Sequence, residues 1–462
     1  MRLSPEALAG LPAAIARPLY DRDAQAVGIV HFGIGAFHRA HQAWYTDAAM
    51  NLGADLGADL GDNADWMITG VSLRSPGVAR QMNPQGGLYS VAEQSAEGMA
   101  LRIVGSVRGV LVASEEPDAV IAAVAAPSTH IVSLTVTEKG YCRAADGNLD
   151  FDLAHSLSFY YFVTQGLLAR AKAGLPGVTL LSCDNLADNG AKLESLMLQY
   201  LARHEPDLVD WFCQNCTCPS TMIDRIVPAT TDEDRASVAE ALGGLLDEAC
   251  HDEACHDEAC VVTEPFSQWV IEDRFAGPRP RWEAVGAQLV SEVAPYETAK
   301  LRMLNGAHSL LAYCGLRAGY TYVHEAIADP DLRSLAEQLM RNEAAPTITP
   351  APNQDLDAYA DALIARFANP CLNHRLIQIA MDGSQKIPQR WLETLAHNAA
   401  NGRTCPAIRE GLSAWIHHLQ GHNGPVDDPQ ADKLSRAANS NEPITALFGE
   451  GGAMAGIWTP QG

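Results

Sequence analysis

Residues 27–45 read VGIVHFGIGAFHRAHQAWY: a short apolar run, two glycines two positions apart, and then a stretch of helical character. The apolar run Val27–Phe32 predicts a buried strand, and residues 38–45 predict a helix. Glycines at such a turn let a backbone approach a pyrophosphate closely, and the N-terminus of a helix favours negative charge. The segment therefore predicts the first strand, turn and helix of a dinucleotide-binding domain.

The turn supplies the candidate cofactor-binding residues, which are Gly33, Gly35, Ala36, Phe37 and His38. His38 stands where the usual pattern has a third glycine. Taken alone, the pattern would suit a tight structural turn about as well. Its place after the first strand of an alternating strand–helix series favours the cofactor site.

The second predicted strand, residues 67–73, bears on the choice of cofactor. An acidic residue that grips the adenosine ribose usually stands near the end of this strand, but here the strand is followed by Arg74 and Ser75. Arg74 can stack on the adenine or meet a 2′-phosphate, and it can equally be an ordinary solvated residue. NAD is the expected cofactor, and NADP stays an alternative.

Two more apolar runs, residues 130–137 and 177–183, continue the series. Short, continuously apolar strands separated by helices are typical of a parallel sheet covered on both faces. From about residue 295 onward the pattern is helical, as in residues 297–313. The sequence thus predicts an α/β fold, with a Rossmann-type dinucleotide-binding domain at residues 1–290 and a mostly α-helical substrate domain at residues 291–462.

Composition narrows the class of protein. A chain of 462 residues, 47% hydrophobic and 19% charged, is expected to form two globular domains. Its formal net charge of −24 argues against nucleic-acid or anionic-membrane partners. No apolar run reaches the roughly 18 residues of a membrane span. Eleven cysteines without a secretory signal predict reduced thiols in the cytoplasm.

Two short tandem repeats stand out, LGADLGADLGD at residues 52–62 and DEACHDEACHDEAC at residues 247–260. The cysteines and histidines of the second invite a metal interpretation. However, the run lacks the CxxC spacing and paired arms of structural zinc sites. Tandem duplication in a surface loop is the favoured explanation, and no metal is expected.

The stretch KLRMLNGAH, residues 300–308, carries the groups that carbonyl chemistry needs. At about 100° per helical residue, Lys300, Asn305 and His308 fall within one arc of roughly 140°. A lysine can act as a general base, an amide can donate to a developing alkoxide, and an imidazole can hold a substrate hydroxyl. A solvated face of an amphipathic helix would give the same spacing.

A second candidate group stands at the end of the strand predicted at residues 177–183. Ligands of open α/β sheets gather at the carboxyl ends of the strands, so Asn185 is a candidate donor to the same reacting oxygen. Capping of the following helix by Asp184 or Asn185 explains these residues equally well.

Together, these stretches resemble a known family. The motifs FGIGAFHRAHQA, VSLTVTEKGYC, LLSCDNL, MIDRIVPA, QWVIED and KLRMLNGAHS occur in the order found in the polyol-specific long-chain dehydrogenases, the mannitol dehydrogenase family, between about residues 27 and 390. The resemblance implies a Rossmann-type domain followed by a helical domain. It also implies NAD or NADP chemistry without zinc, in a monomer or weak oligomer.

The resemblance also implies roles for individual residues. Lys300 would be the general acid/base, Asn185 and Asn305 would stabilise the oxyanion, and His308 would orient the substrate. Glu138 matches a family glutamate that passes protons between the lysine and solvent. Asp224 matches a family acid near the site, and its role stays unassigned.

The stretch at residues 366–390 bears on the substrate, because it resembles fructuronate-reducing members more than mannitol-oxidising ones. The expected pair is D-fructuronate and D-mannonate; mannitol and fructose, or a related polyol such as arabinitol or sorbitol, form the alternative. A uronate carboxylate needs a charge-assisted partner. The candidates are His374, Arg375, Lys386 and Arg390, of which Arg390 is expected to be a surface charge. A non-catalytic nucleotide sensor would need neither Lys300 nor the asparagines.

Overall fold

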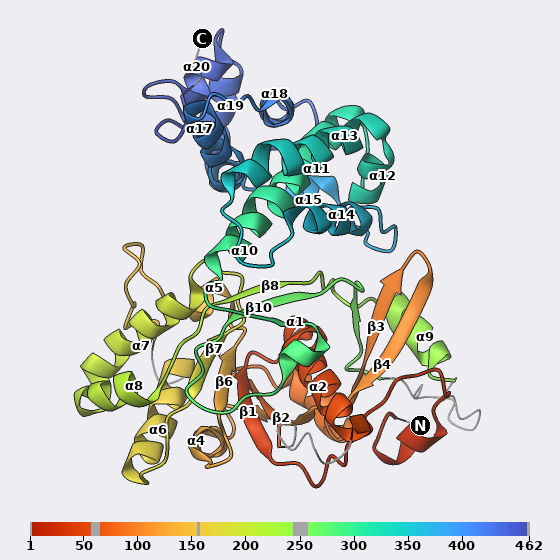
Figure 1. Cartoon of the computed structure of the whole chain (residues 1–462), viewed down its shortest axis with the longest axis vertical. Coiled ribbons are helices and arrows are strands. Elements are labelled where there is room, and N and C mark those ends of the chain that lie inside the picture. Colours follow the sequence, from red (N-terminus) through yellow and green to blue (C-terminus); the bar gives the residue numbers. More distant parts are fainter. Residues whose placement is uncertain (1, 57–64, 155–157, 244–256, 460–462) are drawn as a thin grey trace. The chain divides into compact units, whose positions relative to one another are not determined.

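The computed structural model describes residues 2–56, 65–154, 158–243 and 257–459. The chain divides into two compact units, Met1–Val293 and Ala294–Gly462 (Figure 1). Residues 247–256 of the cysteine-rich repeat and residues 57–62 of the shorter repeat lie outside the described residues.

The first unit is built on a parallel sheet with the strand order β5-β2-β1-β6-β7. This order matches five of the six strands of a Rossmann fold, 3-2-1-4-5, in which the chain starts at the centre and moves outward first on one side and then on the other. Four of its strands, β1, β2, β6 and β7, are the expected ones, with the ends of the last three shortened by one to three residues; β5 was not predicted. The five strands are β1 (Val27–Phe32), β2 (Met67–Ser72), β5 (Val107–Val112), β6 (Ile131–Leu134) and β7 (Thr179–Ser182).

Helices cover both faces of this sheet, which explains why its strands are apolar without alternation. Val30 and Phe32 of β1 belong to a core formed with α4 and α6, whereas Ile29 belongs to a core on the other face, with α2. The helices of this unit are α1 (Ala36–Ala40), α2 (Gln42–Leu56), α3 (Gly77–Met82), α4 (Pro117–Ala125), α5 (Thr137–Gly140), α6 (Phe159–Lys172), α7 (Asn189–His204), α8 (Val209–Asn215) and α9 (Asp232–Ala241). A 3₁₀ helix, Glu6–Gly10, precedes them.

Two small sheets that the sequence analysis did not foresee complete the first unit. One, with the order β4-β3-β9, contains the hairpin visible in Figure 1. The other has the order β11-β10-β8. Their strands are β3 (Tyr89–Ser95), β4 (Gly98–Val104), β8 (Thr221–Asp224), β9 (Val261–Thr263), β10 (Gln268–Glu272) and β11 (Gln288–Val290).

The end of the cysteine-rich repeat corrects one expectation. Asp257 is buried and accepts hydrogen bonds from the Ser90 amide and hydroxyl, the Gln85 amide and the Ala259 backbone. Cys260, which precedes β9, is also buried. Asp257, Ala259 and Cys260 are therefore buried and do not lie in a surface loop, because the last copy of the repeat supplies a carboxylate that satisfies buried backbone donors.

The second unit is helical, as predicted. Its central helix, α11, packs against α12, α15 and α18 around a core that contains Trp391 and Trp415. The helices are α10 (Ala294–Ala299), α11 (Asn305–Ala318), α12 (Val323–Ala328), α13 (Pro330–Gln338), α14 (Leu356–Phe367), α15 (Leu376–Ile379), α16 (Gly383–Ile387), α17 (Glu393–Ala400), α18 (Pro406–Leu419), α19 (Ala431–Ala438) and α20 (Pro443–Phe448). π-Helical turns lie at Lys300–Leu304, Leu339–Ala344 and Pro388–Leu392.

Among the described residues, no helix combines the length and the apolar character that a bilayer crossing requires.

A buried histidine pair beneath the glycine turn makes the stability of the first unit sensitive to acid. The rings of His31 and His38 stack with centroids 3.4 Å apart, and both side chains are fully buried. Burial lowers the pKa of His31 to about 3 and that of His38 well below its ordinary value. Between pH 6.5 and pH 3 the unfolded chain therefore binds protons that the folded chain does not, and stability falls as the pH falls.

We expect His31 alone to account for a loss of about 2 kcal/mol in the free energy of unfolding between pH 7 and pH 5. Urea titrations at the two pH values measure it. In the His31→Gln variant this loss should shrink by about the same amount. An unchanged pH dependence in the variant would contradict the assignment.

Candidate active site

The glycine turn assigns different tasks to its two glycines. Gly33 has a φ of +95°, and a Cβ there would lie 2.1 Å from the Thr135 carbonyl oxygen, so the fold itself requires glycine. Gly35, at the N-cap of α1, differs: a Cβ there would have the Gly33 oxygen, 3.9 Å away, as its nearest neighbour. Packing within the chain does not demand a glycine at residue 35. An open approach to the backbone at a helix start fits a bound pyrophosphate.

The residues after the glycines pack inward. Phe37 stacks on His41 with ring centroids 5.2 Å apart, and the buried ring of His38 stacks on His31 of β1. His38 thus fills the place between helix and strand that a third glycine would leave open. Because its ring is buried, any role of His38 in cofactor binding falls to its backbone, as it does for Ala36.

Arg74 lies two residues beyond β2 and is exposed. Its backbone oxygen accepts a hydrogen bond from the Ser114 hydroxyl at 3.5 Å. Its charge acts on Cys142, where it opposes the rise in pKa that burial causes. The side chain is therefore near the carboxyl ends of the strands, where a nucleotide would meet it.

Glu138 and Asn185 lie at one edge of the parallel sheet. Strands β6 and β7 pair in register, Leu134 with Ser182, so the residues that follow both strands emerge side by side. Glu138 lies on α5 and Asn185 follows β7, and both are exposed in this unit. The helix-capping alternative is wrong, because α7 begins at Asn189 with Asp188 as its N-cap.

Asp184, the residue before Asn185, has a different function that the sequence analysis missed. Its carboxylate accepts hydrogen bonds from the backbone amides of Val136 and Thr137, at 3.0 and 2.9 Å. An acidic residue after a buried strand was the available signal. Only the neighbouring loop, 48 residues earlier in the chain, shows which backbone amides it binds.

Asp224 is the last residue of β8 and is buried. It pairs in register with Gln268 of β10, in a sheet separate from the parallel one. The start of β8 nevertheless adjoins the end of β7, because the Thr221 hydroxyl donates to the Ser182 carbonyl at 2.6 Å. Asp224 therefore lies on the same strand as Thr221, three residues further on, and Thr221 contacts the end of β7 that leads into Asn185.

In the second unit, a π-helical turn brings Lys300 and Asn305 onto one side of a helix. The Asn305 backbone N–H donates to the Lys300 carbonyl, a bond that spans five residues. In such a turn, residues five apart are separated by a smaller angle about the helix axis than in a regular α-helix. The angle between Lys300 and Asn305 is therefore smaller than the roughly 140° expected from about 100° per residue. His308 follows three residues later on α11. π-Turns of this kind are frequent at functional sites.

The imidazole of His308 sits among aromatic and cationic groups. Its ring centroid lies 4.6 Å from that of Phe367 and 5.4 Å from that of His374. Burial lowers the pKa of His308 well below the ordinary value, and His374, Arg366 and Arg390 lower it further. The pKa of His374 is also lowered, by burial first and then by Arg366 and Lys386. Both imidazoles are therefore neutral at pH 7, in a positive local field.

The three remaining candidates behave differently from one another. Arg390 is not the surface charge that was expected: it donates to the Ser309 hydroxyl at 2.8 Å and to the Asn305 carbonyl at 3.3 Å, and burial lowers its pKa to about 10. The π-turn Pro388–Leu392 places Arg390 against α11, which sequence periodicity does not reveal.

Lys386 donates to the carbonyls of Met381 and Ile379, at 2.6 and 3.4 Å. Arg375 is exposed.

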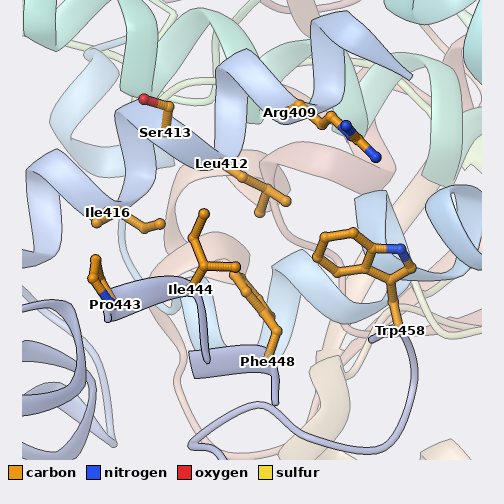
Figure 2. Close-up of a pocket in the computed structure, with 8 residues that line it drawn as sticks. All are labelled: Arg409, Leu412, Ser413, Ile416, Pro443, Ile444, Phe448 and Trp458. Carbon is orange, nitrogen blue, oxygen red and sulfur yellow. The ribbon is translucent and has the colours of Figure 1, made fainter. Parts of the chain in front are cut away.

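A separate pocket of about 400 Å³ lies in the second unit between α18 and α20 (Figure 2). Hydrocarbon side chains such as Leu412, Ile444 and Phe448 form most of its lining, with Trp458 on one side. It contains none of the acid–base groups named above. This pocket is therefore not the candidate active site.

Within the part of the chain that the structure describes, no three His, Cys, Asp or Glu side chains cluster as metal ligands would.

A Rossmann-type sheet with an open glycine turn, followed by a helical unit with lysine, asparagine and histidine on one helix, is the combination expected of a nicotinamide-dependent dehydrogenase. Comparison with known proteins gives the family. The model of the mannitol dehydrogenase Rossmann domain matches residues 27–284, and that of the mannitol dehydrogenase C-terminal domain matches residues 292–455. The chain belongs to the mannitol dehydrogenase family of oxidoreductases, as the resemblance predicted.

Individual relatives agree with this assignment. D-mannonate oxidoreductase of Escherichia coli (strain K12) is 39% identical, over 96% of this chain and 91% of that protein. A substrate-free D-sorbitol dehydrogenase has a similar structure, with a TM-score of 0.86, 32% identity, and coverage of 96% of this chain and 91% of that one. The ternary complex of Pseudomonas fluorescens mannitol 2-dehydrogenase with NAD and D-mannitol has a TM-score of 0.76 and 34% identity, over 98% and 93%.

The two glycines make a matched pair of variants. We expect Gly33→Ala to destabilise the first unit by about 1–3 kcal/mol or more, from backbone strain alone. Gly35→Ala should leave the melting temperature unchanged but weaken NADH binding by about tenfold or more, because its methyl group fills the space left for the pyrophosphate. Thermal melts and titration of NADH fluorescence measure both. Full NADH affinity in Gly35→Ala would contradict this placement of the cofactor.

Proposed function

We propose that this chain catalyses the nicotinamide-dependent interconversion of D-fructuronate and D-mannonate, a ketone and a secondary alcohol on an open-chain sugar acid. The first domain, residues 1–290, would bind the nucleotide, and the second, residues 291–462, would hold the substrate. The observation that carries the proposal is the π-turn that presents Lys300 and Asn305 on one side of a helix, with His308 one turn beyond.

The bound nicotinamide supplies the hydride acceptor in the oxidative direction. Lys300, as the neutral amine, removes the hydroxyl proton of the substrate, and Glu138 passes that proton to solvent. The carboxamides of Asn305 and Asn185 donate to the oxygen as it gains alkoxide character. His308 accepts or donates at a substrate hydroxyl as a neutral imidazole, which its lowered pKa favours.

The cationic surroundings of His308 support an acidic sugar as substrate. Arg366 lowers the pKa of both His308 and His374, Arg390 lowers that of His308, and Lys386 lowers that of His374. A positive field attracts the carboxylate of a uronate and offers nothing comparable to a neutral polyol. The resemblance to D-mannonate oxidoreductase points the same way. D-Mannitol and D-fructose form the second candidate pair, supported by the mannitol 2-dehydrogenase complex.

For the cofactor we propose NAD, supported by the NAD-bound relative, with NADP as the alternative that exposed Arg74 leaves open. We further propose a cytoplasmic monomer or weak oligomer with a small sugar-derived substrate. Free thiols, such as those of buried Cys183 and Cys314, suit a reducing compartment.

A spectrophotometric screen at 340 nm tests the function. D-Fructuronate, D-tagaturonate, D-fructose, D-mannitol and D-arabinitol are offered with each nicotinamide cofactor. We expect the highest kcat/KM with D-fructuronate and NADH. Its KM should rise with salt, because screening weakens attraction of the carboxylate. Robust D-mannitol oxidation without D-fructuronate reduction would reverse the order of the two candidates.

A further inference from the structure

The carboxylate of Asp184 joins the two loops that carry Glu138 and Asn185. Its Oδ1 accepts from the Thr137 amide at 2.9 Å, and its Oδ2 accepts from the Val136 amide at 3.0 Å and from the Tyr141 hydroxyl at 3.0 Å. Asp184 as a whole is 8% exposed, so water contributes little to the solvation of its carboxylate. The donors are two backbone amides and a phenol, all of them neutral.

The loop that Asp184 holds is strained. Thr137 has a φ of +63°, a left-handed conformation that a β-branched residue rarely adopts. Such a conformation persists only where the surroundings impose it. The bond from the Thr137 amide to Asp184 is a direct contact that does so. Glu138 is the next residue, so its direction depends on this backbone conformation.

Further hydrogen bonds hold the Asp184 backbone and the Tyr141 hydroxyl that donates to its carboxylate. The Tyr141 hydroxyl lies 2.6 Å from the Ser182 hydroxyl, and the Asp184 amide donates to the same Ser182 oxygen at 3.3 Å. The Asp184 carbonyl accepts from the Asn189 side chain at 3.0 Å. The backbone that leads into Asn185 is therefore held by the same residue that holds Thr137.

We propose that Asp184 is a positioning residue that fixes Glu138 and Asn185 relative to each other at the carboxyl ends of β6 and β7. The inference rests on the proposed function, in which these two residues handle the proton and the oxyanion. Asp184 touches neither substrate nor cofactor in this scheme; it acts through its neighbours.

Asp184→Asn tests the proposal with little change of shape. One oxygen of an amide can accept from Thr137 or from Val136, but the NH₂ group would then face the other backbone N–H, donor against donor. We expect kcat to fall by about 10²-fold, as for displacements of about 1 Å at a reacting centre. The pH profile of kcat should come to resemble that of Glu138→Gln, and the Val136 and Thr137 amides should exchange hydrogen faster.

Thr137→Gly separates positioning from general damage. Glycine adopts a positive φ without strain, so the loop in this variant depends less on Asp184. We expect Thr137→Gly to recover part of the kcat lost in Asp184→Asn. Asp257→Asn is the matched control: it alters another buried carboxylate that accepts from backbone amides, and should lower the melting temperature while leaving the pH profile of kcat unchanged.

If the wild type is active and kcat is unchanged in Asp184→Asn, the positioning role of Asp184 is refuted while the proposed function stands. The same holds if kcat falls in Asp184→Asn and Thr137→Gly recovers none of it. A wild type inactive toward every compound of the screen would overturn the proposed function and this inference with it. The exchange rates of the two amides report the loop contact in either case.

Discussion

Replacing Lys300 by alanine is expected to lower kcat by about 10²–10⁴-fold, the contribution typical of a positioned general acid or base. Cofactor affinity and melting temperature should stay close to those of the wild type. The π-turn that begins at Lys300 contains a backbone hydrogen bond from the Asn305 N–H to the Lys300 carbonyl, and this bond does not involve the lysine side chain. Steady-state kinetics at 340 nm and NADH titration measure the two effects separately.

The control for this variant is Lys172→Ala, which removes an exposed lysine from the end of α6. It should leave kcat unchanged. A small primary amine added to Lys300→Ala should restore part of the lost rate, since it can take the place of the missing side chain. Near-normal turnover of Lys300→Ala at pH 7 without added amine would refute the assignment of Lys300 as the acid/base.

The sequence predicts the parallel sheet well, and the reason is physical. Strands such as Val27–Phe32 are buried on both faces, so their apolar character is continuous and unambiguous. The glycine turn is equally legible, because the +95° φ of Gly33 can be tolerated by few other residues. Local rules of this kind depend on a few neighbouring residues, and they placed four of the five strands of the parallel sheet within a few residues of their observed ends, with β5 missed.

The features that the sequence did not reveal depend on contacts between distant segments. Arg390 was expected at the surface, yet it bonds to Ser309, 81 residues away. Asp184 was considered as a helix cap, yet it binds the amides of Val136 and Thr137. Periodicity cannot show either contact, because both partners lie on other elements. The family resemblance identified candidate catalytic residues, but not the residues that hold them.

The π-turn at Lys300–Leu304 is a further feature that sequence periodicity does not predict. A regular helix of 100° per residue placed Lys300 and Asn305 about 140° apart. One backbone bond that spans five residues brings them closer to a single line. The letters KLRML do not indicate this change; the turn contacts α14 and the π-turns Leu339–Ala344 and Pro388–Leu392, which lie far from it in the sequence.

Removing the Asn305 carboxamide is the second change with a large expected effect. Asn305→Ala should lower kcat by about 10²–10³-fold, because one donor to the developing alkoxide is lost. KM should change little, since the interaction strengthens only as charge builds on the oxygen. The backbone bond from Arg390 to the residue 305 carbonyl remains available in the variant, so the helix should stay intact. Asn305→Asp should be more damaging still, because a carboxylate repels the alkoxide.

The control for Asn305→Ala is the removal of an asparagine whose side chain has a structural role. Asn398 is buried and donates to the carbonyls of Glu343 and Thr394, so Asn398→Ala should lower the melting temperature and leave kcat of the folded enzyme unchanged. Asn185→Ala combined with Asn305→Ala should lose less than the product of the single losses, as groups that act as a unit do. If Asn305→Ala lowered only the melting temperature, as Asn398→Ala is expected to do, Asn305 would be a structural residue and Lys300 would need another oxyanion partner.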